Sequence, residues 1–152
     1  MATSTTVLPT EVIRQLAALE AAADGIIDEM LDAGVDAVKP EVEKKLKNAI
    51  SGEYATGELE KSTAVKSKKY KDGTKAKVIY FKGTSRKQKA KNGRIYKRKK
   101  AVRLNEIAAV LEYGKSDQPP RAFLRPAFNA KNEDIARAME RKFDELTKKY
   151  QS

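Results

Sequence analysis

An apolar stripe through the N-terminal third of the chain constrains the fold more than any other feature. Apolar or small residues recur every three or four positions from Val12 to Ala49, which is the spacing of one face of an amphipathic helix. Gly34 and Pro40 interrupt the stripe, because glycine costs about 1 kcal/mol and proline about 3 kcal/mol inside a helix. We therefore expect either two helical segments or one helix that is kinked between residues 34 and 40.

Two further helices are predicted in the C-terminal third. A second apolar stripe begins at Phe128 and predicts a helix over residues 127–149. Pro126 suits the first position of that helix, since the missing N–H would have no helical partner there. A shorter helix is expected over residues 104–113, and Gly114 is placed to terminate it.

The segment between the helices has the pattern of β-strands. Residues 77–82 are rich in β-branched and aromatic side chains, and a turn former precedes them, so residues 61–82 predict a hairpin. Another strand is expected to begin at Arg94 and to extend toward Val102. The stretch at about residues 83–100 offers few apolar side chains for a core, and we expect it to be an exposed basic loop.

These elements predict a single α+β domain over residues 10–152. A long N-terminal helical region and a C-terminal helix are expected to pack on a small antiparallel sheet, because their apolar stripes need a shared surface. Residues 1–9 are rich in Thr and Ser and are expected to form a flexible tail. No apolar run approaches the roughly 20 residues that cross a bilayer, so we expect no membrane partner.

The charge of the chain is concentrated in one segment. Residues 66–103 contain 17 Lys or Arg residues and one acidic residue, which gives this segment a net charge of +16. The rest of the chain carries −5, so the net charge of the whole chain is +11. Such clustering is typical of proteins that contact a polyanion, most often nucleic acid. A solvated surface is the simpler alternative. The candidates for contact with DNA or with an acidic protein surface are Arg86, Lys87, Lys89, Lys91, Arg94, Lys97, Arg98, Lys99 and Lys100.

Aromatic side chains alternate with these cations, and two readings of them are open. Tyr80, Phe81 and Tyr96 could stack on bases, as aromatic residues do in single-strand binders. Alternation along a strand produces the same pattern, and we favour that reading. Contact with the phosphate backbone is therefore expected rather than base recognition.

The residue types that are missing exclude much of enzyme chemistry. The chain has no cysteine and no histidine, which removes disulfides, thiolate or imidazole zinc sites, and mechanisms with a histidine base. Glu53, Glu58 and Glu60 are too close in sequence to indicate a convergent metal site. We expect a protein without enzymatic activity, cofactor or metal.

Two short motifs carry a resemblance to a known family. Glu112-Tyr113-Gly114 precedes the run Pro119-Pro120-Arg121-Ala122-Phe123-Leu124-Arg125-Pro126-Ala127, and Thr56-Gly57-Glu58-Leu59-Glu60-Lys61-Ser62 lies upstream. This pattern resembles the small head-to-tail joining proteins of tailed phages, which are also described as neck, tail-completion or minor tail proteins. The chain departs from the pattern at Tyr54-Ala55, where the family has a proline. The residues that match are Thr56, Gly57, Leu59, Glu112, Tyr113, Gly114, Arg121, Arg125 and Pro126.

The resemblance implies a structural virion protein that is made in the cytoplasm of a bacterial host. It implies a homo-oligomeric ring, such as a hexamer or a dodecamer, at the neck, tail-completion or tail-terminator position. Its partners would be the portal or connector and tail proteins, with duplex DNA passing non-specifically through the lumen. The charge pattern alone also fits a different function, that of a free non-specific nucleic-acid-binding protein using residues 66–103.

Two subunit contacts are considered at this stage. Arg121 or Arg125 could pair with Glu112 at an intersubunit edge, or could be exposed, while Phe123 and Leu124 are expected to fill the domain's own core. The acidic residues of the N-terminal helical region could form an interface with the basic loop, although a solvated helix face is simpler. These acidic residues are Glu11, Glu20, Asp24, Asp28, Glu29 and Asp32.

Overall fold

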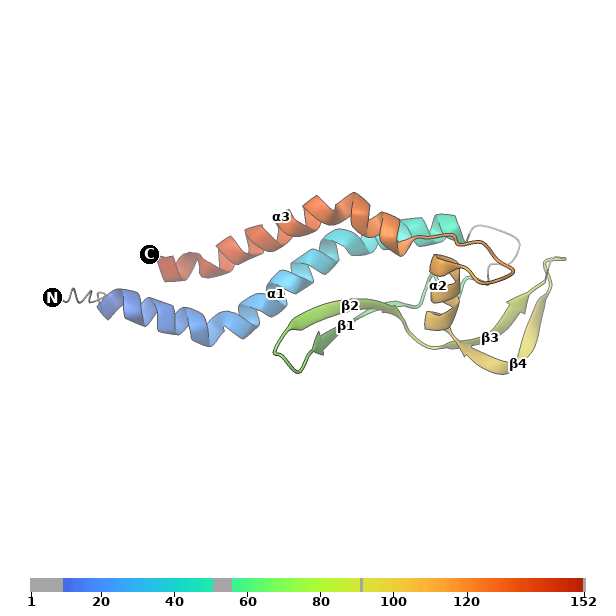
Figure 1. Cartoon of the computed structure of the whole chain (residues 1–152), viewed down its shortest axis with the longest axis horizontal. Helices are drawn as coiled ribbons and strands as arrows, with labels where there is room; N and C mark the ends of the chain where they lie inside the picture. Colours follow the sequence, from blue (N-terminus) through green and yellow to red (C-terminus); the bar gives the residue numbers. More distant parts are fainter. Residues whose placement is uncertain (1–9, 51–55, 91, 152) are drawn as a thin grey trace, which may run out of the picture.

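The two apolar stripes of the sequence pack against each other. The computed structural model describes residues 10–50, 56–90 and 92–151. Helices α1 (Thr10–Ala49) and α3 (Leu124–Gln151) run antiparallel along the length of an elongated molecule (Figure 1). They approach closely at Gly34, where an added Cβ would lie only 3.2 Å from Met139 and 3.3 Å from Ile135. Even an alanine at this position would require the side chains of Met139 and Ile135 to shift by a few tenths of an ångström.

Helix α1 is continuous, so of the two expected arrangements the division into two segments is wrong and the single helix through Pro40 is confirmed. Pro40 lies inside it, and Figure 1 shows one unbroken ribbon. The side chains of Val38, Val42 and Leu46 on either side of the proline are fully buried. Burial of each contributes about 1.5–3 kcal/mol, which offsets the cost of about 3 kcal/mol for an internal proline.

The expected hairpin at residues 61–82 is confirmed. Strands β1 (Thr63–Lys69) and β2 (Lys75–Phe81) pair antiparallel from Thr63↔Phe81 to Lys69↔Lys75. In the turn, Gly73 has a φ of 89°, and the Asp72 carboxylate accepts a hydrogen bond of 2.9 Å from the N–H of Thr74. The bonds that Asp72 accepts from Thr74 hold the pKa of that carboxyl below its usual value.

The strand expected from Arg94 toward Val102 is confirmed, but the stretch expected to be an exposed basic loop is a second hairpin. Strands β3 (Thr84–Lys89) and β4 (Ile95–Arg103) pair antiparallel, with a bulge between Ser85 and Lys87. Backbone hydrogen bonds hold the ribbon together although most of its side chains remain exposed. A pattern of apolar residues could not predict β3 for that reason, because the hairpin buries little beyond Ser85 and part of Val102.

The core lies where helix α2 (Leu104–Tyr113) meets both long helices and the strands. Leu104, Ala108 and Leu111 of α2 are buried there. Phe81 and Phe123 meet in the same core, edge to face with their ring centroids 5.7 Å apart. The other members of the core are Val38, Val42, Leu46, Leu59 and Ala127.

The expected α+β class is confirmed, and two details of the arrangement differ. The described strands form two separate two-stranded sheets, and α3 packs mainly along α1 while β2 lies against α1. Helix α3 also begins at Leu124, earlier than residue 127, so Pro126 falls within its first turn. The predicted helix over 104–113 is present with the same bounds, and Phe123 is buried as expected.

Candidate functional site

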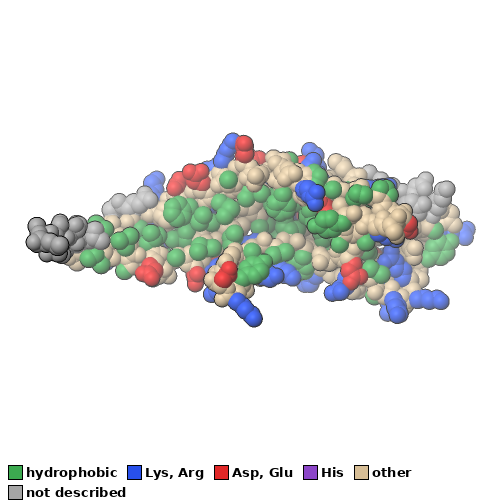
Figure 2. All heavy atoms as spheres, in the orientation of Figure 1, with side chains coloured by type: hydrophobic (Ala, Val, Ile, Leu, Met, Phe, Trp, Pro, Cys, Tyr) green, Lys and Arg blue, Asp and Glu red, His purple; other side chains and the backbone are tan. Residues whose placement is uncertain are grey.

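The basic residues singled out in the sequence gather on the β3–β4 hairpin. This hairpin lies at the end of the molecule opposite the start of α1 and the end of α3 (Figure 1), and Lys and Arg side chains project at that end (Figure 2). Lys91 lies outside the described residues. Of the others, Lys89 and Arg98 are half-buried, and six are exposed, namely Arg86, Lys87, Arg94, Lys97, Lys99 and Lys100.

None of these eight cations forms an ion pair within the described residues. The first hairpin behaves differently. Lys75 lies 3.1 Å from an Asp28 carboxylate oxygen, and Lys77 lies 3.1 Å from Asp32. The hydrogen bond that Lys75 donates to the Asp28 carboxylate raises the pKa of Lys75. Three of the acidic residues considered for a subunit contact, Asp24, Asp28 and Asp32, therefore pair within the chain.

The register of the second hairpin places like charges opposite each other. Lys87 and Lys97 are direct cross-strand partners. Like charges in directly opposed positions destabilise a sheet, and no carboxylate among the described residues offsets this pair. The hairpin therefore presents positive charge that an external polyanion could neutralise.

The aromatic residues near these cations do not form one stacking surface. Phe81 is buried in the core, and the Tyr80 ring lies beneath the Lys66 ammonium, 4.9 Å from ring centroid to nitrogen. Tyr96 alone of the three lies on β4, where it is exposed and pairs across the ribbon with Gln88. This arrangement supports contact with phosphates more than stacking of successive bases.

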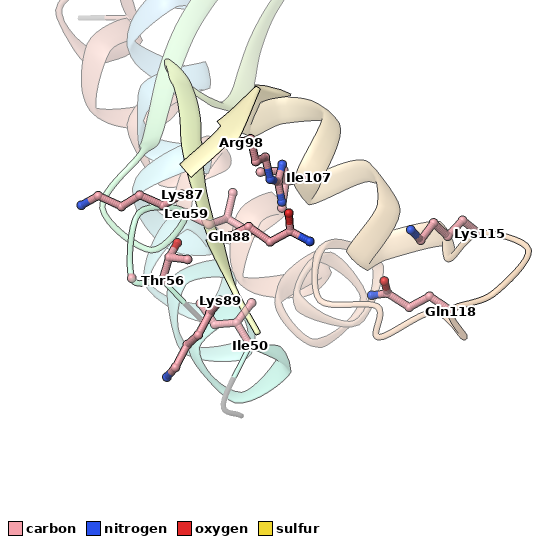
Figure 3. A pocket seen from close by; sticks show the side chains of 11 residues that line it. Ile50, Thr56, Leu59, Lys87, Gln88, Lys89, Arg98, Ile107, Lys115 and Gln118 are labelled. Carbon is pink, nitrogen blue, oxygen red and sulfur yellow. The ribbon is translucent and has the colours of Figure 1, made fainter. Parts of the chain in front are cut away.

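A hollow of about 300 Å³ opens at the base of the β3–β4 hairpin. Figure 3 shows Arg98, Ile107 and the amide of Gln88 near its centre, and Lys115 and Gln118 across from Lys87 and Lys89. Thr56, Gly57 and Leu59 of the upstream motif also line it. The fold thus brings that motif against the basic hairpin, which the sequence alone did not indicate.

Glu58 fixes this contact. Its carboxylate accepts hydrogen bonds from the hydroxyls of Ser85 and Thr56, which joins the motif to the first residues of β3. Gly57 has a φ of 78° in the turn before it, and Leu59 is buried in the core after it. The sequence pattern does not reveal this role of Glu58, because its partner Ser85 is 27 residues away.

Glu112 joins the end of α2 to the start of α3. Its carboxylate accepts hydrogen bonds from the backbone N–H groups of Phe123 (2.8 Å), Leu124 (2.8 Å) and Arg125 (3.0 Å). Pro126 has no N–H, and the N–H of Ala127 bonds to the Phe123 carbonyl at 3.2 Å. The carboxylate and the proline together leave no orphan donor in the first turn of α3.

The sequence left open whether Arg121 or Arg125 pairs with Glu112, and within the chain the Glu112 carboxylate binds backbone N–H groups instead. Glu112 is only 5 % exposed. Burial raises the pKa of its carboxyl, but the three backbone N–H bonds and the nearby charge of Arg125 outweigh burial and lower it overall. The Arg121 guanidinium donates instead to the Ala49 carbonyl at 3.5 Å. The Glu112 carboxylate is therefore part of an internal joint between α2 and α3.

Gly114 allows the chain to leave α2 toward this joint. Its φ is 74°, and an added Cβ would lie 2.8 Å from both the Gln118 carbonyl oxygen and the Pro120 nitrogen. The next residues close a tight loop, in which the N–H of Lys115 donates to the Gln118 carbonyl at 2.9 Å. Tyr113, the middle residue of the motif, is exposed and has a surface role if it has one at all.

Two other classes of site were sought. The described residues contain no group of three or more Asp and Glu side chains that could hold a metal ion, and none of their helices is long and apolar enough to cross a membrane. Comparison with protein-family models, curated proteins and solved structures finds no match to this chain.

Proposed function

We propose that this protein is a structural subunit of the head-to-tail interface of a tailed phage. Copies of the chain would form a ring between the portal or connector and the tail, with the β3–β4 hairpin facing the genome in the lumen. The observation that carries the DNA-facing role is the set of eight described hairpin cations without an ion pair. The virion location rests on the resemblance of the Glu112 and Thr56 motifs.

The exposed positions of the cations favour a contact that ignores base sequence. Phosphate attraction depends on charge and counterion release and not on base identity. A protein beside a moving genome needs this kind of contact, because every sequence of the genome passes it. The proposal requires no cofactor, no catalytic residue and no membrane.

The same hairpin also supports a second candidate, a free non-specific nucleic-acid-binding protein. Oligomeric state distinguishes the two functions. A ring subunit assembles into closed particles alone or with portal and tail proteins, whereas a free binder shifts DNA as a monomer or dimer. Negative-stain images of the purified protein, with and without duplex DNA, separate these outcomes.

Removing three exposed lysines of β4 should weaken DNA binding in a salt-dependent way. We expect Lys97→Gln, Lys99→Gln and Lys100→Gln together to reduce the slope of log affinity against log salt by about 0.9 for each lysine that contacts a phosphate. The melting temperature should change little, because exposed charges contribute little to stability. Fluorescence anisotropy with two duplexes of unrelated sequence measures both the slope and the lack of sequence preference.

A matched variant controls for net charge. Lys44→Gln, Lys47→Gln and Lys148→Gln remove the same charge from exposed positions on α1 and α3, and they should leave the slope close to that of the unaltered protein. Equal slopes for the two triple variants would show that the hairpin is not the DNA-binding surface.

A further inference from the structure

The β1–β2 hairpin has one face that packs on the rest of the chain and one that does not. In β2, Lys75 and Lys77 pair with aspartates of α1, and Phe81 is buried in the core. Successive side chains of a strand point to opposite faces of the sheet. The odd-numbered residues of β2 therefore face the body of the protein, and the even-numbered residues face away from it. We call the second side the outer face of the hairpin.

Two lysines of β1 lie on this outer face above tyrosine rings. Lys66 and Lys68 are opposite even-numbered residues of β2 in the register. The Lys66 ammonium lies 4.9 Å from the centroid of the Tyr80 ring, and the Lys68 ammonium lies 4.7 Å from that of Tyr70. Contact with the face of a ring attracts a cation without neutralising its charge. The two rings therefore hold positive charge in place on the outer face.

Three more exposed lysines belong to the same hairpin and its end, namely Lys69, Lys71 and Lys82. None of the five lysines forms an ion pair with a described residue. Asp72 is the one acidic residue between positions 61 and 83, and its carboxylate accepts the N–H of Thr74. The first hairpin thus presents positive charge in addition to that of β3–β4.

The two hairpins are joined end to end. Lys82 and Gly83 alone separate β2 from β3. The N–H of Lys82 donates to the Ser62 carbonyl at 2.9 Å, and the Gly83 carbonyl accepts the N–H of Leu104 at 3.0 Å. Pairing therefore passes from one hairpin to the other within two residues, and both hairpins lie on the same side of the long helices (Figure 1).

The length of this joined ribbon suits a duplex. A strand rises about 3.3 Å per residue, so residues 75–89 span at most about 50 Å. One turn of duplex DNA is roughly 34 Å long. A single duplex that lies along the ribbon can therefore contact both hairpins.

The chemistry of the outer face favours duplex phosphates over single strands or a protein partner. Tyr70 adjoins the turn, whereas Tyr80 lies near the other end of the hairpin, and a lysine lies over each ring. The two rings therefore form no platform for successive stacked bases. Protein interfaces are depleted in lysine and have an apolar centre, whereas clustered lysines bind a phosphate backbone of any sequence.

We propose that the β1–β2 hairpin is a second phosphate-binding site, which contacts the same duplex as the β3–β4 hairpin. The inference rests on the proposed DNA-facing role of β3–β4 and extends the contact to a part of the chain that this role does not require. Because both sites act on one duplex, each binding event neutralises phosphates at both hairpins. The two contributions to the salt dependence of binding therefore add.

A triple variant of the full chain tests the second site. Lys66→Gln, Lys68→Gln and Lys71→Gln together should reduce the slope of log affinity against log salt by about 0.9 for each lysine that contacts a phosphate. Fluorescence anisotropy measures the slope with a duplex of about 24 base pairs, which is about 80 Å long. Combination with the three β4 substitutions should reduce the slope by the sum of the two separate reductions.

Two controls accompany this variant. Lys66→Arg, Lys68→Arg and Lys71→Arg keep the charges and should keep the slope of the unaltered protein, and circular dichroism verifies that both triple variants are folded. The triple variant of α1 and α3 described above removes the same charge elsewhere and should also leave the slope unchanged.

The outcomes separate this inference from the proposed function. An unchanged slope in the β1–β2 variant beside a reduced slope in the β4 variant would refute the second site and leave the proposed function intact. A reduced slope in the β1–β2 variant alone would overturn the joint contact together with the DNA-facing role of β3–β4. Near-normal slopes in both triple variants, with binding lost only on combination, would show that the hairpins bind separate duplexes and would refute the joint contact. An unaltered protein that does not bind the duplex refutes both.

Discussion

Glu112→Ala should lower the free energy of unfolding by about 3–4 kcal/mol, because it leaves three backbone N–H groups without an acceptor. A buried donor without a partner costs about 1–3 kcal/mol, and the N–H groups at Leu124 and Arg125 are close enough to the surface to regain some hydration. Urea denaturation followed by circular dichroism measures the loss. Helix α3 should also fray first at its N-terminal end.

Glu112→Gln is the matched variant for this prediction. The amide keeps one carbonyl oxygen of similar placement but loses the charge, so we expect a smaller loss of about 1–2 kcal/mol. Losses below 1 kcal/mol in both variants would show that water replaces the carboxylate at little cost, and that the joint between α2 and α3 does not depend on Glu112.

The pH dependence of stability follows from the same carboxylate. The pKa of Glu112 is lower in the folded state than the value of about 4.3 of an unperturbed glutamate. The contribution of the Glu112 carboxylate to folding stability is therefore complete above the pKa of the unfolded state. It is lost as the pH falls through the lower pKa of the folded state. The difference in free energy of unfolding between the unaltered protein and Glu112→Gln should stay constant between about pH 5 and about pH 7. It should shrink in more acidic solution, and melts at intervals of about one pH unit measure it.

Phe123→Ala should destabilise the protein by about 3–5 kcal/mol, which is the usual range for a phenylalanine truncated in a core. Its side chain is fully buried. The edge-to-face contact between the rings of Phe123 and Phe81 contributes about 0.5–1.5 kcal/mol of that loss. Because Phe123 directly precedes α3, the cavity would lie beside the Glu112 joint. Denaturant melts at neutral pH measure the change.

Phe128→Ala is the control for residue type. Phe128 lies in α3, five residues after Phe123, but it is 42 % exposed, so its truncation should cost clearly less than that of Phe123. Equal losses at the two positions would show that the centre of the core is not where the structure places it.

The sequence predicted the elements that bury a regular apolar face. The stripes of α1 and α3, the residues 61–82 hairpin and helix α2 all have the period of their structure, because packing selects the side chains on one face. The apolar stripe left open whether α1 continues through Pro40, since the answer depends on how deeply Val38 and Val42 are buried by other elements. The sequence shows the energetic cost of a proline inside a helix. It does not show the burial of neighbouring side chains that offsets this cost in the folded protein.

The charge pattern of the sequence identified which residues belong to the candidate site, but it did not predict how they are arranged. Residues such as Lys87 and Lys97 were identified from composition, whereas their pairing across a ribbon required the register. Glu112 was identified as part of a motif. The residues around it do not predict that its carboxylate accepts hydrogen bonds from the backbone eleven residues further along the chain. The partner is close only because α2 and the 115–118 loop reverse the chain, as the tight loop at Lys115 and Gln118 shows.

The antiparallel packing of α1 on α3 has a consequence for how the chain folds. Gly34 and Met139, which meet in this packing, are about a hundred residues apart, and closing so long a loop costs more entropy than closing either hairpin. The hairpins and α2 can therefore form early, and the docking of the long helices comes late. φ-values near zero at this contact and higher values in the β1–β2 hairpin would be the kinetic signature. During synthesis α3 emerges after the other described elements, so the part of the α1 stripe that α3 covers stays uncovered until then.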